Sequence, residues 1–193
     1  MVRSLKGVLI VLAIALGFGV AILVYARVTG LRASARPGSI ETTLARAIRG
    51  VAIPSEERRR PNPVPADAGA VAAGLAHFAD HCAGCHANDG SGEADLGRGM
   101  FPPAPDMRLD ATQRLTDGEL FYIIEHGIRF SGMPAFGTGD LEHAEQSWQL
   151  VHFIRHLPKV SESELNRMRE LNPRPAAEIR QEIEEERFLR GEP

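Results

Sequence analysis

The only two cysteines of this 193-residue chain lie in one decapeptide, HCAGCHANDG at residues 81–90, and a histidine directly follows the second. A Cys-x-x-Cys pair can provide redox chemistry, half of a metal site or covalent attachment of a prosthetic group. Each of these uses requires a different fold around the pair. Cys82, Cys85 and His86 therefore constrain the architecture more than any other feature of the sequence.

The surrounding residues favour covalent haem. A redox dithiol expects a thioredoxin-like βαβ pattern, and the sequence shows no alternation of strands with helices. A structural zinc site normally draws its second ligand pair from farther along the chain, whereas the candidates here all fall within residues 81–86. In haem c attachment, Cys82 and Cys85 form thioethers and the adjacent His86 binds the iron. We predict one covalent haem c, with a zinc-stabilised interaction domain as a distant alternative.

The sixth iron ligand is expected in the stretch FSGMPAFG, where Met133 stands between Gly132 and Pro134. The glycine lets the backbone approach the ring, and the proline fixes the direction of the chain beyond the sulfur. Met100 and Met107 follow the haem-attachment motif too closely for the chain to pass around the ring to its far face. Met133 is therefore the predicted ligand.

Axial ligation decides the chemistry. With His86 and Met133 both bound, the iron has no open position and can only exchange electrons, so we predict an electron carrier and not an enzyme. A bis-His centre through His126 or His143 is one alternative. The chief rival from another class is a haem enzyme or a gas or peroxide sensor, in which Met133 does not bind and the iron stays open.

Residues 66–159 resemble the class I c-type cytochromes. A helix leading into CxxCH, a loop with prolines, a middle helix, a Met loop and a C-terminal helix occur in the family's order. Gly74 and Phe153 resemble the residues at which the family's first and last helices cross. The resemblance implies a small all-α class I cytochrome c fold around one covalent haem, with no strands.

The resemblance also implies two supporting contacts. In the loop MFPPAPDM, a proline carbonyl is expected to accept the Nδ1 proton of the ligating histidine, which fixes the ring and raises its basicity. Pro103 is the first candidate and Pro102 the second. Arg129, shortly before the Met loop, is predicted to pair with a haem propionate, with Arg98 and Arg108 as rivals.

Helix signals support this order independently. Apolar residues in VAAGLAHFADHC fall on one helical face. The middle helix opens with a capping box from Thr116 to Glu119 and should end at Gly127. A last helix is expected from about Asp140 to His156, with Trp148 in the core.

The N-terminus carries a membrane signal. Residues 7–26 contain no charge, and a helix of that length spans the roughly 30 Å hydrocarbon core. A cleaved signal peptide is the alternative, because basic residues precede the run and ASA at 33–35 resembles a cleavage site. The run exceeds a secretory core of about 7 to 15 residues, so residues 1–28 are predicted to be an uncleaved, single-pass anchor. The resemblance places haem domains of this type on the periplasmic (outer) side of the cytoplasmic membrane.

The distribution of charge divides the chain into three zones. Residues 1–65 hold ten basic and three acidic residues, residues 66–159 six and thirteen, and residues 160–193 six and nine. Residues 29–65 are expected to be a basic, Pro- and Arg-rich linker. Within it, SIETTLARAIRG predicts a short helix that lies on the membrane surface or on a partner, or stays marginal in a flexible tether.

The tail, residues 160–193, is expected to be helical and solvated, with a cap at Ser161 and Glu164 and docking to a partner subunit as the alternative. Predicted partners are electron donor and acceptor proteins with basic surfaces and other subunits of a respiratory oxidase or dehydrogenase complex, but no nucleic acid. The expected function is one-electron transfer in a membrane-associated respiratory chain, by a free-standing carrier or a complex subunit.

Overall fold

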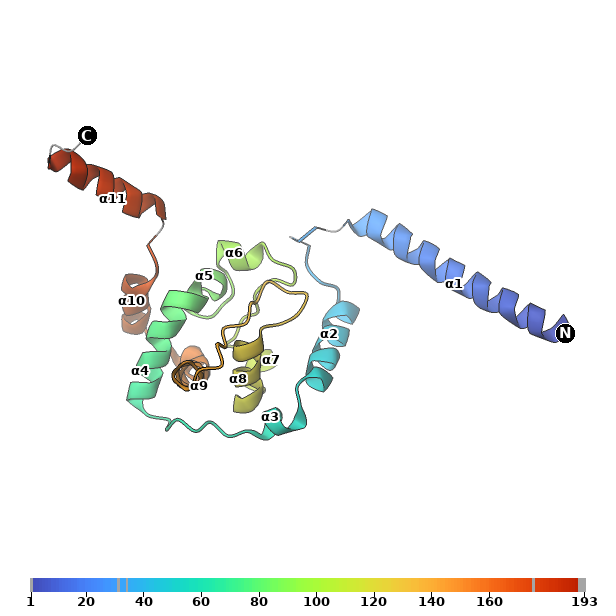
Figure 1. The fold of residues 1–193 in the computed structure, drawn as a ribbon, viewed down its shortest axis with the longest axis horizontal. Coiled ribbons are helices and arrows are strands. Elements are labelled where there is room, and N and C mark those ends of the chain that lie inside the picture. The colour runs from blue at the N-terminus through green and yellow to red at the C-terminus, as the bar shows by residue number, and fades with distance from the viewer. Residues whose placement is uncertain (1, 31, 34, 175, 191–193) are drawn as a thin grey trace. The chain divides into compact units, whose positions relative to one another are not determined.

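The computed structural model describes residues 2–30, 32–33, 35–174 and 176–190 and divides into two compact units, Met1–Ala35 and Arg36–Pro193. All regular elements in these ranges are helices and none is a strand (Figure 1), which confirms the all-α prediction. Ser34, in the middle of the candidate cleavage motif, lies outside the described residues.

The first unit is dominated by the helix α1, Val2–Thr29. Its stretch Leu5–Val28 is long and apolar enough to cross a membrane, a property that signal sequences share. The apolar side chains along it are exposed within the chain, so they find no protein core to cover them. The predicted N-terminal apolar helix is therefore confirmed.

The second unit holds the haem-attachment motif and a single hydrophobic core. Two elements are irregular: η1 is a π-helical turn and η2 a 3₁₀ turn. In chain order its elements are α2 Ser39–Ala52, α3 Ser55–Arg59, α4 Ala68–His77, η1 Phe78–Cys82, α5 Ala83–His86, α6 Asp95–Arg98, α7 Asp110–Gln113, α8 Asp117–His126, α9 Leu141–His156, η2 Leu157–Lys159, α10 Glu162–Leu171 and α11 Ala176–Leu189.

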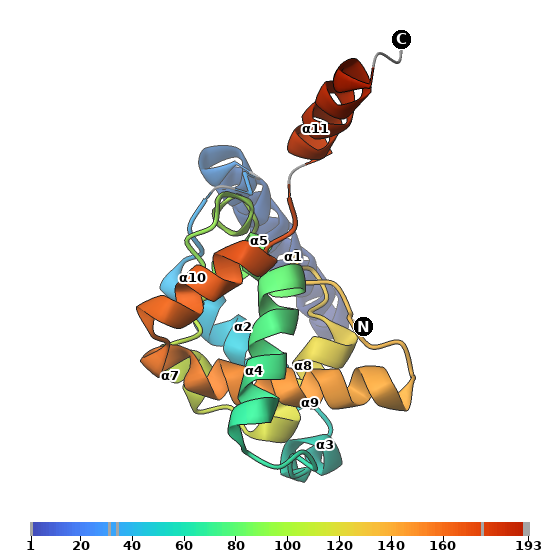
Figure 2. The same ribbon diagram turned by 90° about the vertical axis from the view of Figure 1, so that its left-hand side faces the viewer.

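The crossing of α4 and α9 organises this core (Figure 2). Gly74 lies at the closest point, where an added Cβ would be 2.9 Å from the Cβ of Phe153 and even closer to the carbonyl oxygen of Gln149. Only glycine fits at this distance. The predicted crossing of Gly74 with Phe153 is thus present, and it holds the start of the haem-attachment motif against α9.

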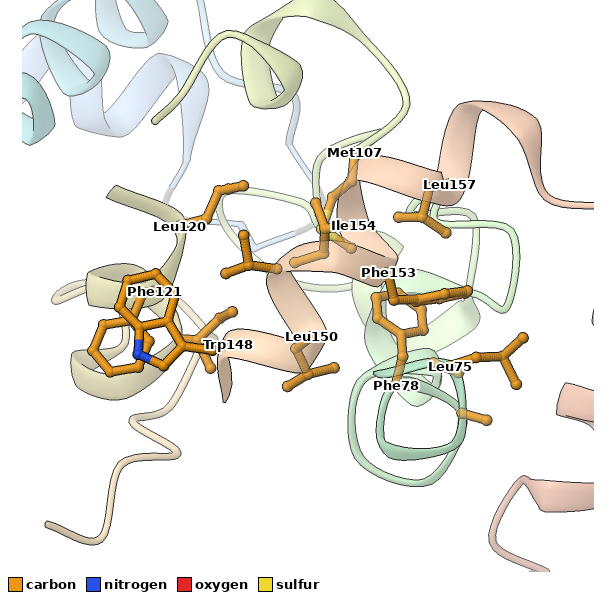
Figure 3. Close-up of a cluster of buried hydrophobic side chains, with 14 of the residues drawn as sticks. Leu75, Phe78, Met107, Leu120, Phe121, Trp148, Leu150, Phe153, Ile154 and Leu157 are labelled. Carbon is orange, nitrogen blue, oxygen red and sulfur yellow. The ribbon is translucent and has the colours of Figure 1, made fainter. Parts of the chain in front are cut away.

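Two aromatic pairs lie in the core (Figure 3). Phe78 packs against Phe153 with ring centroids 5.2 Å apart, and Phe121 stacks on Trp148 at 3.9 Å with an interplanar angle of 8°. All four side chains are buried. They tie α8 and η1 to α9, the helix that contacts both.

The middle helix α8 begins and ends as predicted. The Thr116 hydroxyl accepts a hydrogen bond from the Glu119 amide at 3.1 Å, and the Glu119 carboxylate accepts one from the Thr116 amide at 2.8 Å. Gly127 ends the helix with φ 65°. Its missing Cβ leaves room for the Met loop, since a Cβ there would be 2.7 Å from the carbonyl oxygen of Met133.

The packed unit extends beyond the predicted N-terminal boundary at residue 66. Ile53 is 4% exposed, the Arg58 carbonyl accepts a hydrogen bond from the Thr116 hydroxyl at 2.7 Å, and Asn62 donates to the Trp148 carbonyl at 3.0 Å. The guanidinium of Arg60 lies 4.9 Å from the Phe121 ring centroid. Residues 53–62 of the expected linker therefore pack across α8 and α9, and we call this segment the strap.

The packed unit also extends beyond residue 159. The capping box predicted at Ser161 and Glu164 is confirmed, and it starts α10. Met168 on α10 has no exposed surface, and Asn172 donates a hydrogen bond to the Ala79 carbonyl at 2.9 Å. The first third of the expected solvated tail therefore covers the core.

Candidate haem-binding site

The attachment motif lies where a helix changes its winding. The helix α4 continues into the π turn η1, and the amide of Ala83 donates to the carbonyl of Phe78. Single π turns in helices frequently mark functional sites because they redirect side chains without ending the helix. Here the turn ends at Cys82, and α5 then carries Cys85 and His86.

Both thiols are unpaired. Cys82 packs against the hydrophobic core. Burial, with a smaller contribution from the nearby Cys85, raises the pKa of Cys82 from 9.0 to about 12, so this thiol is protonated at neutral pH. The two sulfurs are therefore available as thiols on one short segment.

The His86 imidazole is largely enclosed. Its ring centroid lies 6.4 Å from that of Phe78. Burial lowers the pKa of His86 below its ordinary 6.5, and the backbone of Pro105 only partly offsets this effect. The ring is therefore neutral at neutral pH, the form that binds metals. Its Nδ1 is buried and has no hydrogen-bond partner of good geometry within the described residues.

The proline that reaches His86 differs from the predicted one. The sequence favoured Pro103 and then Pro102, whereas the structure brings the backbone of Pro105 to the ring. The cause is the path of the loop, because backbone hydrogen bonds fix the chain on both sides of Pro105. The Ala104 amide donates to the Gly97 carbonyl at 3.0 Å, and the Met107 amide to the Gly90 carbonyl at 2.8 Å.

The chain leaves His86 through a strained residue. Ala87 has φ 59° and ψ 158°, a region that residues other than glycine rarely adopt. The His86 carbonyl accepts a hydrogen bond from the Gly92 amide at 2.8 Å. At Gly97 an added Cβ would lie 2.9 Å from the Ala104 Cβ and would collide with the Cys85 carbonyl oxygen. Strain and close packing thus hold the loop against the motif.

The loop after α8 presents Met133. The carbonyl of Met133 accepts a hydrogen bond from the Ile128 amide at 3.1 Å, and its amide donates to the Ser131 hydroxyl at 3.2 Å. The Phe136 amide donates to the Ile124 carbonyl at 3.0 Å. The backbone on both sides of the half-buried Met133 is therefore fixed.

The two rival methionines have different surroundings. Met107 is 7% exposed and belongs to the hydrophobic core. Met100 is half-buried, and its sulfur packs directly over Gly132, the neighbour of Met133. The sequence argument set Met100 aside for its short separation from His86, but the fold brings it to the Met loop. Met100 is therefore the rival that an experiment has to separate from Met133.

The three arginines considered as partners of a haem propionate differ in their ion pairs. Arg98 pairs with Glu93 and Asp95, and Arg108 pairs with two other carboxylates, Asp89 and Asp106.

Arg129 is exposed, and no ion pair to it occurs among the described residues. Arg98 and Arg108 are thus already paired with carboxylates, whereas Arg129 has no ion pair in this part of the chain. The rival ligands His126 and His143 are both exposed, and His126 packs against Tyr122 with ring centroids 4.3 Å apart.

The donor set fits haem c better than zinc. The chain presents two free thiols and a neutral, largely enclosed imidazole on adjacent turns, and a thioether on a fixed loop. Thioether and imidazole are the ligands of electron-transfer haem iron. Among the described residues, no group of three or more His, Cys, Asp or Glu side chains could hold a metal ion. The zinc alternative therefore has no ligand set in this part of the chain.

The fold and this motif define a cytochrome c domain. Residues 69–154 match the family model described as cytochrome c oxidase, cbb3-type, subunit III, a match that spans less than half of the chain. The protein thus carries a cytochrome c domain similar to that oxidase subunit, together with an N-terminal apolar helix. A comparison with curated proteins finds no match.

Proposed function

We propose that this protein is a membrane-anchored one-electron carrier whose haem c is held by Cys82 and Cys85 and ligated by His86 and Met133. The match to an oxidase subunit family supports electron transfer in general. The specific proposal is supported by two features of the described residues: a largely enclosed, neutral His86 on the attachment segment, and a Met133 whose backbone is fixed on a separate loop. When bound, the haem supplies reversible one-electron exchange at its iron.

The residues of the chain position the groups that would hold the haem. The π turn and α5 present both thiols and the imidazole from one rigid segment, while the core on α9 fixes that segment. The Pro105 backbone lies beside the His86 ring and partly offsets the effect of burial on its pKa. The hydrogen bonds of the Met133 backbone limit the movement of this loop, so little structural change would accompany electron transfer. Arg129 is proposed to pair with a propionate.

Absorption spectra of the haem-loaded protein test the ligation. We expect a low-spin c-type spectrum with the ferric methionine charge-transfer band. Met133→Ala should abolish this band, and the matched control Met100→Ala should retain it. Loss of the band only in Met100→Ala would transfer the role of ligand to Met100.

Other spectra would support the rival functions. A high-spin spectrum that is indifferent to Met133 would indicate an open iron and a haem enzyme or sensor. A chain without haem absorbance, from a host competent in c-type maturation, would support the zinc-stabilised domain. A low-spin spectrum without the methionine band, altered in His126→Ala or His143→Ala, would indicate a bis-His centre.

The location is proposed to be the cytoplasmic membrane, with α1 retained as a single-pass anchor and the haem domain on the periplasmic side. The length and apolarity of α1 support this location, and so does the type of oxidase subunit that the domain resembles. Intact mass of the mature protein tests it. A mass that lacks residues 1–35 would show a cleaved signal peptide instead.

The proposed partners are an electron donor and an electron acceptor with basic surfaces. Residues 66–159 hold thirteen acidic against six basic residues, which favours such surfaces mainly through the association rate. The domain acts either as a free-standing carrier or as a cytochrome subunit of an oxidase or dehydrogenase complex. Purification in mild detergent without crosslinking distinguishes them, because a subunit keeps its complex.

A further inference from the structure

The helix α2 has an apolar stripe that no part of its unit covers. The stripe repeats at helical spacing, and its members are each more than half exposed. The exposed fractions are 84% for Ile40, 58% for Leu44, 58% for Ile48 and 87% for Val51. At about 100° per residue, these four side chains fall within an arc of about 80°. An exposed stripe of this kind on a stable helix indicates a contact surface.

The opposite side of α2 faces its own domain. Ile53, at the end of the helix, is buried, and Arg49 is half-buried. Burial lowers the pKa of Arg49, nearby Arg46 lowers it further, and Glu119 on α8 opposes both effects. Arg58 also donates hydrogen bonds to the carbonyls of Gly50 and Ile53. The stripe therefore points away from the domain to which α2 is fixed.

The chain between α1 and α2 limits what can meet this stripe. Only residues 30–38 connect the two helices, and a fully extended chain of that length reaches at most about 35 Å. If α1 spans the bilayer, the first residue of α2 must lie within that distance of the end of α1. Residues 27–52 carry five arginines and one glutamate. This excess of positive charge attracts phosphate headgroups.

We propose that α2 lies in the interface of the membrane that α1 crosses, with Ile40, Leu44, Ile48 and Val51 buried among the headgroups. An amphipathic helix with an apolar face and flanking basic residues binds in this position. Because Ile53 and the Arg58 bonds fix α2 to the domain, this contact sets the orientation of the haem domain above the membrane. The inference rests on the proposed anchoring by α1.

Spin-label accessibility in the full-length, haem-loaded chain tests this inference. The chain is placed in lipid nanodiscs that contain anionic lipid, one copy in each disc. A nitroxide is attached to Ile48→Cys on the stripe, to the matched control Arg46→Cys on the other side of α2, or to Leu16→Cys in α1. Collisions with oxygen, which is concentrated in the bilayer, are compared with collisions with a water-soluble nickel chelate. Unchanged haem absorbance shows that each labelled domain is folded.

We expect the ratio of oxygen to nickel accessibility to be severalfold higher at position 48 than at position 46, and high at position 16. Equal, water-like ratios at 48 and 46 with a high ratio at 16 would overturn the position of α2 and leave the anchor intact. A water-like ratio at 16 would overturn both. A high ratio at 48 that occurs only with two copies in each disc would replace the membrane with a second copy of this chain.

Discussion

Replacement of Gly74 by alanine tests whether the crossing of α4 and α9 positions the haem-attachment motif. An alanine Cβ would lie 2.9 Å from the Phe153 Cβ, at least half an ångström short of the ordinary 3.4 Å contact. Neither that Cβ nor the Gln149 carbonyl can rotate away, so the two helices must separate. Overpacking of this kind costs up to about 3 kcal/mol, while alanine favours the helix by about 1 kcal/mol. We expect Gly74→Ala to lower the free energy of unfolding by about 2 kcal/mol.

Urea titration of the haem-loaded chain in mild detergent measures this change, with the fluorescence of Trp148, the only tryptophan, and the haem absorbance as probes. Gly50→Ala in α2 is the matched control, because a Cβ there meets nothing within 4 Å. That control should be neutral or stabilising by up to about 1 kcal/mol. A Gly74→Ala variant within about 0.5 kcal/mol of the parent, with an unchanged denaturant slope, would refute the reasoning.

Three further substitutions test other parts of the domain. Met168→Ala should destabilise the domain by about 2 to 5 kcal/mol in the same titration, because the side chain is fully buried; a loss below about 0.5 kcal/mol would mean that α10 is solvated. Glu164→Gln should lower stability more at neutral pH than at an acidic pH below the folded-state pKa of Glu164. Although burial alone would raise the pKa of Glu164, hydrogen bonds from Ser161 and His156 hold it below 4.5, so its contribution is lost as pH falls through the folded-state pKa. An equal loss at both pH values would contradict this. Ala87→Gly should stabilise the domain by about 1 kcal/mol because it relieves the strained backbone, and a destabilised variant would show that the strain is absent.

Local signals predicted much of this fold. The capping boxes at Thr116 and Ser161 each depend on residues three positions apart, and both begin helices in the structure. The capping boxes were predictable because the sequence determines them within one helical turn. The place of Gly74 in the crossing was implied by the resemblance to class I c-type cytochromes.

Contacts between distant residues were less predictable. Pro105, rather than Pro103, reaches His86 because backbone bonds distant in sequence set the loop path, and the run of prolines does not distinguish its members. The π turn at Phe78–Cys82 left no pattern in the sequence.

The core contacts of Ile53 and Met168 were not predicted. Ile53 lies in a basic, Pro-rich segment and Met168 in a highly charged one, and neither composition is typical of a core. Leu165 and Leu171, each three positions from Met168, were the available signal for α10. The strap had no such repeat.

If α1 is the proposed membrane anchor, the packing of the strap limits how far the haem domain can travel from it. A free tether of about forty residues would let the domain explore a radius of roughly 130 Å around the point where α1 leaves the membrane. With α2 fixed to the domain through Ile53, the free segment contracts to residues 30–38 and its maximum reach to about 35 Å. Since volume scales as the cube of the radius, the effective concentration of the domain near an adjacent membrane partner rises roughly fiftyfold. Such a carrier serves immediate neighbours in the bilayer at high frequency and cannot reach distant ones.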